Sequence, residues 1–387
     1  DEIFEHAGGA SSAYMGEALI ITRDGLVQSD DLSTIKGKPN SLGSTGRMLR
    51  LDEVYRASVV HSELTESTRV LVSQDETEVT IQSTLKDGGE AAICKVTRPE
   101  LEDFQRDAAQ VAAYADLRDD RLPEIHILIS DQLSFFGAVT RLQRAGFRWT
   151  LEMISAALDW STMLGQRVKL GLGCPRPELF SPLVQPLIQT PSHGAFPSGH
   201  SVQAHMIAEL LTHLRFPDLA ATPLPRKGEA DEHVLQLYRQ AARVAINRTV
   251  AGVHYPSDSA SGATIGISLA RLLVARAKNA LKSSSCDDST ARGLDFDGGT
   301  YAVVDDAGHK HTRDYDVGEL AKLLSGKDPA ASLFNPLTPP PAPLFAVLWE
   351  KAESEWAEHW GCAVAAMNTS EAQGAGAAGY DGSPHLD

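Results

Sequence analysis

Long helical patterns, separated by short proline- and glycine-rich breaks, fill residues 99–282 and constrain the fold of this 387-residue chain more than any other feature. One pattern starts at Pro99, followed by the acids Glu100, Glu102 and Asp103 that a helix N-terminus prefers. The others run over Ser130–Gln143, Phe147–Gly165, Ser198–Arg215, Glu229–Val250 and Pro256–Leu281. Apolar faces of consecutive helices bury one another, so the sequence predicts a mainly α fold, a helical bundle.

Short β-branched segments flank the bundle and predict small β-hairpin decorations. They are Arg69–Ser73, Glu78–Leu85 and Ala91–Val96, with a turn signal at Asp87-Gly88-Gly89, and Tyr301–Val304, with a turn at Asp305–Gly308. We read residues 1–50 as an arm or loops, 282–300 as a loop and Pro336–Pro343 as a stiff linker before a last helix, Leu344–Trp360. The tail after Asn368 is expected to fray.

These patterns divide the chain into three parts. Residues 1–98 are the arm and small β-element, 99–282 the catalytic core, and 283–387 a C-terminal extension with a hairpin, the proline linker and the terminal helix. No internal repeat is visible.

Composition excludes several classes of partner. The net charge of −16 and a pI of about 5.2 argue against nucleic acid or an anionic membrane surface. The most apolar stretch, Ser259–Ala277, is interrupted by Ser, Gly and Arg271, so we expect no membrane span. Residues 1–20 hold no apolar signal core.

The cysteines lack metal-ligand spacing and predict ordinary thiols: Cys94, Cys174, Cys286 and Cys362. The compartment stays open, with a periplasmic or secreted location favoured over the cytoplasm.

Three segments gather basic residues in this acidic chain: Lys169–Pro177, Phe196–His200 and Asn247–Asp258. They contain Lys169, Arg176 and Arg248 but a single acid, Asp258. Arginine presents a planar pair of donors that matches a tetrahedral oxyanion, and lysine adds a point charge. The segments therefore predict an anion site.

The second segment predicts a helix start. Ser198 is a good N-cap, and Gly199 lets a backbone N–H approach an oxygen closely. A helix N-terminus binds anions through its free N–H groups and its dipole, and it places His200 in the first turn. In the third segment Asp258 follows His254 by four residues. A carboxylate on one imidazole nitrogen leaves the other as a nucleophile or ligand. The sequence thus predicts an oxyanion pocket centred on His254, with His200 as its acid/base partner.

The three segments, in this order, resemble the signature shared by vanadium-dependent haloperoxidases and the type 2 phosphatidic acid phosphatase superfamily. That pattern is Lys, six residues, Arg-Pro; then Pro-Ser-Gly-His; then Ser-Arg, five residues, His, three residues, Asp. Here it is met by Lys169 with Arg176-Pro177, by Pro197–His200, and by Arg248 with His254 and Asp258. One departure is Asn247, where the family usually has Ser. The resemblance implies the family's helix-bundle core.

The resemblance also implies roles. In a haloperoxidase the cofactor is vanadate, with phosphate as a competing occupant, and His254 is the metal ligand. The vanadate oxygens are held by Lys169, Arg176, Ser198, the Gly199 N–H and Arg248, and His200 is the acid/base. In a phosphatase His254 is the nucleophile and His200 protonates the leaving group. Asp258 orients His254 in both cases.

His193 bears on the choice between these chemistries. It lies seven residues before His200, where algal-type bromoperoxidases of the resembling family carry His and fungal chloroperoxidases carry Phe. A loop histidine at the pocket rim is the plain alternative. On this basis we expect a vanadate-dependent haloperoxidase that oxidises halide, preferably bromide, with hydrogen peroxide and halogenates small organic substrates, as a homo-oligomer. The alternatives are a soluble acid phosphatase with a phosphohistidine intermediate and a non-catalytic anion-binding member of the family.

Overall fold

The computed structural model describes residues 17–18, 20–22, 44–216, 232–282 and 289–361. The chain divides into two compact units, residues 1–47 and 48–387, and the packing reported below lies within the second. Cys94 and Cys174 are buried free thiols, whereas Cys286 and Cys362 lie outside the described residues.

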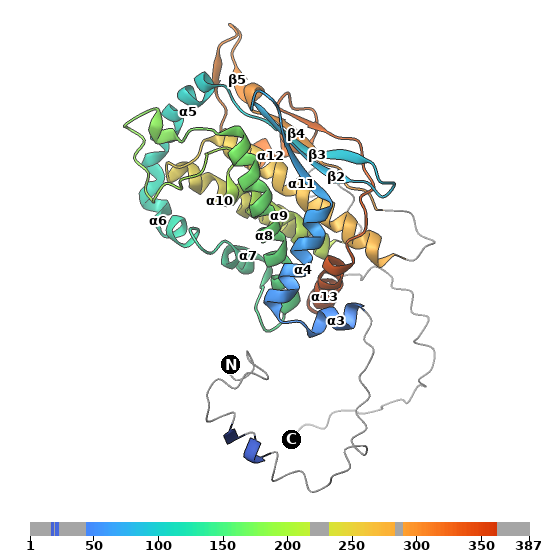
Figure 1. Ribbon diagram of the computed structural model, residues 1–387. Coiled ribbons are helices and arrows are strands. Elements are labelled where there is room, and N and C mark those ends of the chain that lie inside the picture. Colours follow the sequence, from blue (N-terminus) through green and yellow to red (C-terminus); the bar gives the residue numbers. More distant parts are fainter. Residues whose placement is uncertain (1–16, 19, 23–43, 217–231, 283–288, 362–387) are drawn as a thin grey trace, which may run out of the picture. The chain divides into compact units, whose positions relative to one another are not determined.

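Helices form most of the second unit (Figure 1), so the predicted mainly α class is confirmed. Over the described part of residues 44–361 the helices are α3 (Ser44–Arg50), α4 (Glu53–Glu66), α5 (Leu101–Ala113), α6 (Arg118–Ile127), α7 (Leu133–Thr140), α8 (Arg148–Leu172), α9 (Gly199–Arg215), α10 (Glu232–Val250), α11 (Pro256–Leu281), α12 (Val317–Leu324) and α13 (Pro343–Trp360). Short 3-10 turns lie at Tyr114–Leu117, Pro177–Leu179 and Gly298–Thr300.

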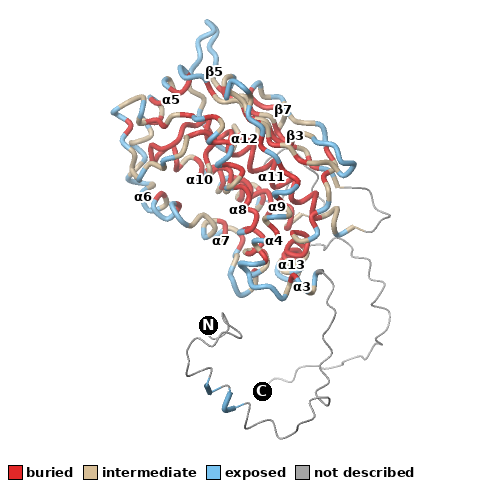
Figure 2. Tube along the Cα trace, viewed as in Figure 1, coloured by how far each residue is buried: buried red, intermediate tan, exposed pale blue. Residues whose placement is uncertain are grey.

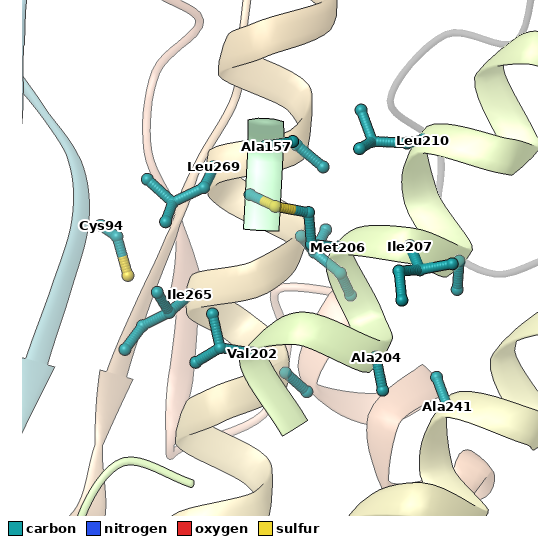
Figure 3. Packing of buried hydrophobic residues seen from close by; sticks show 14 of the residues in the cluster. Cys94, Ala157, Val202, Ala204, Met206, Ile207, Leu210, Ala241, Ile265 and Leu269 are labelled. Atoms are coloured by element: carbon teal, nitrogen blue, oxygen red, sulfur yellow. The ribbon is translucent and has the colours of Figure 1, made fainter. Parts of the chain in front are cut away.

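Helices α9 and α11 form the centre of the core, and both are buried over most of their length (Figure 2). Figure 3 shows Val202 and Met206 of α9 beside Ile265 and Leu269 of α11 in one continuous apolar cluster. Glycine allows the close approach: a Cβ added at Gly266 would lie 2.2 Å from the Val202 carbonyl oxygen. The start of α9 is therefore held tightly against α11.

A five-stranded sheet packs against α11 through β3 and β4 (Figure 1). Its strands are β1 (Thr68–Val72), β2 (Glu78–Thr84), β3 (Glu90–Thr97), β4 (Leu294–Asp297) and β7 (Ala331–Leu333), in the order β1-β2-β3-β4-β7. β3 and β4 run parallel, with Cys94 opposite Leu294, and the other pairs are antiparallel. A separate hairpin joins β5 (Ala302–Val304) and β6 (Lys310–Thr312).

Both predicted hairpins are confirmed, but the β-structure is larger than small decorations. The predicted loop over residues 282–300 contains β4, whose Leu294 and Phe296 point into the core. This strand has only four residues and lies between glycines. Its alternation of apolar and polar side chains is therefore too short to predict a strand. Gly293 is required there, because a Cβ would lie 1.5 Å from the Ile93 carbonyl oxygen.

Helix boundaries also differ from prediction. Residues 44–50, expected in an arm or loops, form α3, and the helix α4 was not predicted. The helix predicted to end at Gly165 continues to Leu172, where Gly173 in the left-handed conformation caps it. The run predicted from Ser130 to Gln143 is helical only over Leu133–Thr140. Among the described residues no helix is both long and apolar enough to cross a membrane, as the sequence predicts.

Candidate active site

Four helix ends bring the three predicted segments together. Lys169 lies in the last turn of α8, Gly199 and His200 open α9, Arg248 lies in the last turn of α10, and Asp258 lies in the first turn of α11. Ser198 is the N-cap of α9, and its hydroxyl accepts from the Ser201 N–H, as predicted. The same end of α9 is tied to α11 because the Ser198 N–H donates to the Asp258 carbonyl oxygen at 2.9 Å.

A cavity of about 170 Å3 lies where these ends meet. Six of the predicted site residues line it: Lys169, His193, Gly199, His200, Arg248 and His254. The other three, Arg176, Ser198 and Asp258, are buried and are not among the lining residues. The cavity has room for a tetrahedral oxyanion, and it opens to solvent beside Thr162 and Gln166, whose side chains are exposed.

His254 is oriented from behind by a carboxylate. Its Nδ1 lies 2.7 Å from Oδ2 of Asp258, and the same oxygen accepts the Tyr255 N–H at 3.1 Å. Burial raises the pKa of Asp258, whereas the nearby Lys169 charge and the Tyr255 N–H lower it. A carboxylate accepting both bonds leaves His254 with its proton on Nδ1 and a lone pair on Nε2. His254 and Asp258 are paired as predicted, but they do not share one helix. α11 begins at Pro256, so His254 precedes the helix and Asp258 lies in its first turn.

Arg176 lies on the Nε2 side of His254, opposite the nitrogen that faces Asp258. Its Nη1 donates to the Val253 carbonyl oxygen at 2.6 Å and lies 3.2 Å from Nε2 of His254, while its Nε donates to the His193 carbonyl oxygen at 3.2 Å. These bonds fix the two loops on either side of the cavity. Burial, and then the charge of Arg176, lower the pKa of His254 well below its usual value, so the imidazole is neutral.

His200 faces His254 with a defined tautomer. Its Nε2 lies 2.8 Å from the carbonyl oxygen of Leu128, which can only accept, so Nε2 carries the proton and Nδ1 has a lone pair. Burial, and then the charge of Arg248, lower the pKa of His200 to about 3. The neutral ring is therefore a base in the protein without an anion.

The cavity has an excess of positive charge. Lys169 donates to the carbonyl oxygens of Gly194 and Ala195 at 2.9 and 3.0 Å and is 2% exposed. Arg248 is 3% exposed, and its Nε and Nη1 have no hydrogen-bond partner among the described residues. Buried guanidinium donors without acceptors are costly. Burial, and then the charge of Arg176, lower the pKa of Arg248 to about 10. Such a cavity favours an anion strongly.

His193 is held by the loop that carries it. Its Nδ1 lies 3.1 Å from both the Gly194 carbonyl oxygen and Nη2 of Arg176, and one tautomer can satisfy only one of these contacts. Burial lowers the pKa of His193. The ring therefore lines the cavity as a neutral group.

The cavity also contains residues that the motifs did not identify. Thr162, Gln166 and Gln203 line it, and the Leu128 carbonyl orients His200. Thr162 and Gln166 lie seven and three residues before Lys169, on the same face of α8, so helical spacing could have found them. Gln203 lies one turn after His200 on α9.

Residues 152–282 match the model of the PAP2 superfamily. This range contains all nine predicted site residues, and the similarity to the superfamily is confined to it. One solved structure, the crystal structure of the first transmembrane PAP2 type phosphatidylglycerolphosphate phosphatase from Bacillus subtilis, shares 22% identity, covering 46% of this chain and 79% of that chain. Its TM-score of 0.27 is too low for a comparison of the two folds. No curated protein matches the chain.

Proposed function

Starting from the PAP2 superfamily domain at residues 152–282, we propose that this protein hydrolyses phosphate monoesters through a phosphohistidine at His254. One observation carries the proposal. His254 presents an unprotonated Nε2 in a small cationic cavity, with its other nitrogen fixed by Asp258 at 2.7 Å. This is the arrangement of an activated nucleophile whose orientation is set by a third group.

Binding uses the unsatisfied positive charge. Lys169 and the free donors of Arg248 lie at the cavity, and Gly199 presents its backbone there without a side chain. Burial, and then the charge of Arg176, lower the pKa of Lys169 and Arg248, and a bound phosphate dianion raises both by favouring the charged forms. Arg176 Nη1, 3.2 Å from Nε2 of His254, is positioned to exchange that contact for a phosphate oxygen when Nε2 attacks phosphorus.

In the first step, the Nε2 lone pair of His254 attacks phosphorus and the bond from phosphorus to the ester oxygen breaks. The leaving oxygen takes a proton from Nδ1 of His200. That proton comes from the ester monoanion on binding. Burial, and then the charge of Arg248, lower the pKa of His200, and the negative charge of the bound ester raises it. The Leu128 carbonyl keeps Nδ1 directed at the cavity throughout.

In the second step, neutral His200 accepts a proton from water at Nδ1, and the water oxygen attacks phosphorus as the bond from phosphorus to Nε2 of His254 breaks. Phosphate takes that proton from Nδ1 of His200 and leaves as the dihydrogen monoanion, so His200 is neutral again and His254 returns with its proton on Nδ1. Asp258 stabilises the positive charge that develops on His254 in both steps.

A haloperoxidase is the second candidate, and it is favoured by His193, which lines the cavity without a role in phosphoryl transfer. The residues fit vanadate, since the unpartnered donors of Arg248 and the Nε2 of His254 suit a tetrahedral oxyanion with one protein ligand. Lys169, Arg176, Ser198, Gly199 and Arg248 would hold its oxygens. Bound vanadate would supply a Lewis acid that activates hydrogen peroxide toward halide.

The sequence placed the haloperoxidase first, and two observations reverse that order in our proposal. The superfamily match supports the broader family and none of its haloperoxidase features. His193 also directs Nδ1 at Arg176 and Gly194, which makes it part of the loop rather than an uncommitted group.

Paired assays test the proposal. The protein is assayed with p-nitrophenyl phosphate without vanadate, and separately for bromination of a diketone with vanadate, bromide and hydrogen peroxide. We expect hydrolysis that vanadate inhibits, and its loss by at least about 10³-fold in His254→Ala. Halogenation without hydrolysis would establish the second candidate instead. Phosphate binding without turnover in either assay would identify a non-catalytic anion-binding protein.

Substrates with different leaving groups distinguish the roles of the two histidines. His200→Ala is expected to slow hydrolysis of an alkyl phosphate more than that of p-nitrophenyl phosphate, because only the alkoxide requires a proton as it leaves. His254→Ala should abolish both reactions equally. Equal losses with both substrates in His200→Ala would remove the general-acid role assigned to His200.

A further inference from the structure

Polar side chains of α8 and α9 form one wall of the cavity beyond the cationic groups. Thr162 and Gln166 of α8 and Gln203 of α9 line it together with Gly165. The phosphate-binding residues lie on the same two helices: Lys169 is one turn after Gln166 on α8, and His200 is one turn before Gln203 on α9. Whatever is attached to a bound phosphate therefore meets this polar wall.

The wall is ordered by a hydrogen-bond relay. Nε2 of Gln132 donates to Oε1 of Gln203 at 2.7 Å, and Nε2 of Gln203 donates to Oγ1 of Thr162 at 3.0 Å. The relay fixes which end of the Gln203 amide faces Thr162. Because Oγ1 of Thr162 accepts this bond, its own proton remains available, as does the second proton on Nε2 of Gln203. Thr162 and Gln203, which both line the cavity, thus each keep one donor for a bound group.

Gly165 provides the room for a leaving group. It is buried in the middle of α8 and lines the cavity, and a Cβ added to it would meet nothing within 4 Å. Glycine inside a helix costs about 1 kcal/mol relative to alanine. The open space beside it continues the cavity along α8 toward Thr162 and Gln166.

The cavity opens to solvent on the side where the leaving group lies, because the lining residues Thr162 and Gln166 are both exposed. A phosphate held by the cationic groups therefore directs its leaving group along this side. The first few atoms of the leaving group then lie against Thr162, Gln203 and Gln166.

We infer that Thr162, Gln166 and Gln203 form a leaving-group subsite that selects phosphate esters carrying hydroxyl groups next to the phosphate over alkyl esters of the same size. The inference rests on the proposed function and names its substrate class. Oriented donors favour hydroxyl and ether oxygens, and an alkyl group placed against them leaves them without acceptors. The three residues act on specificity, and none takes part in bond breaking.

The test compares glycerol phosphate with n-propyl phosphate, which differ by two hydroxyl groups. We expect wild-type kcat/KM to favour glycerol phosphate by at least about tenfold. Thr162→Val and Gln203→Leu should each bring that ratio toward one, and Gln166→Leu should do so in part. Gln105→Leu, an exposed helical glutamine of α5 outside the cavity, serves as a matched control and should leave the ratio unchanged.

A second readout separates this inference from the proposed function. The Kd of each ester is measured by calorimetry under conditions without turnover, and phosphate binding by each variant reports that the cavity has folded. Preferential binding of glycerol phosphate without hydrolysis of either ester would overturn the proposed function and support the subsite. Hydrolysis with equal kcat/KM for both esters, or a preference for the propyl ester, would overturn the subsite and support the function. If the esters are neither hydrolysed nor distinguished in binding, both the proposed function and the subsite are contradicted.

Discussion

Lys169 couples anion binding to pH at the scale of a single residue. Burial, and then the charge of Arg176, lower its pKa from 10.5 to about 7. The ammonium form is therefore present below that pH and is lost above it. We expect the affinity for sulfate, a dianion throughout the range, to fall about tenfold between about pH 6 and about pH 9. Isothermal calorimetry of the wild-type protein measures this directly.

Lys169→Arg is the matched control, because arginine keeps its charge over the whole range. Asp258, whose pKa is raised, also lowers sulfate affinity as the pH rises, because its ionisation adds negative charge. Asp258 is retained in Lys169→Arg. The pH dependence of sulfate affinity that remains in Lys169→Arg is therefore due to Asp258. The part that this variant loses is due to Lys169. Identical profiles for both proteins would contradict the role assigned to Lys169.

The sequence could predict the residues of the site but not all of their partners. Side-chain type and spacing point to His254, Asp258 and the basic cluster, because these groups share short segments. The acceptor that fixes His200 is a backbone carbonyl at Leu128, 72 residues away. Every residue has a backbone carbonyl, so only the folded position of Leu128, directly after α6, reveals it as the acceptor for His200.

At the scale of elements, the contact between α9 and α11 depends on glycine. Gly266→Ala should destabilise the protein by about 1–3 kcal/mol, because the Cβ would lie 2.2 Å from the Val202 carbonyl oxygen and force the backbones apart. This loss of stability is expected even though alanine has the higher helix propensity, by about 1 kcal/mol. Gly165→Ala on α8 is the control, expected to be neutral or stabilising by up to about 1 kcal/mol, since its Cβ meets open space. Urea unfolding measures both, and equal effects would contradict the close approach.

The helices were predictable where their pattern is long, whereas the sheet was predictable only in part. β1, β2 and β3 are adjacent in sequence and joined by turns, one of which has Gly88 at a φ of +88°. β4 pairs with β3 across about 200 residues, with Cys94 opposite Leu294. Pairing over that distance is set by tertiary packing, which a local pattern does not encode.

At the scale of the whole second unit, carboxylates from distant elements cap the helices. Glu63 of α4 accepts the Leu344 and Phe345 N–H groups at the start of α13, at 2.9 and 3.0 Å. In turn, Glu355 of α13 accepts the Trp149 and Thr150 N–H groups at the start of α8, both at 2.8 Å. α8 has no side-chain cap of its own. The C-terminal helix therefore stabilises the helix that carries Lys169.

This dependence predicts the effect of Glu355→Ala. Three donors would lose their acceptor, the two N–H groups and Oγ1 of Thr150, which donates to Glu355 at 2.7 Å. The expected loss in the free energy of unfolding is about 1–2 kcal/mol, as for removal of an N-cap. Glu355→Gln should cost less, because an amide oxygen still accepts. Glu358→Ala, exposed on the same helix one turn later, is the control and should change stability by no more than about 0.5 kcal/mol. If Glu355→Ala and Glu358→Ala unfold at the same denaturant concentration, α8 does not depend on the carboxylate from α13, and its N-terminal N–H groups must be satisfied by water instead.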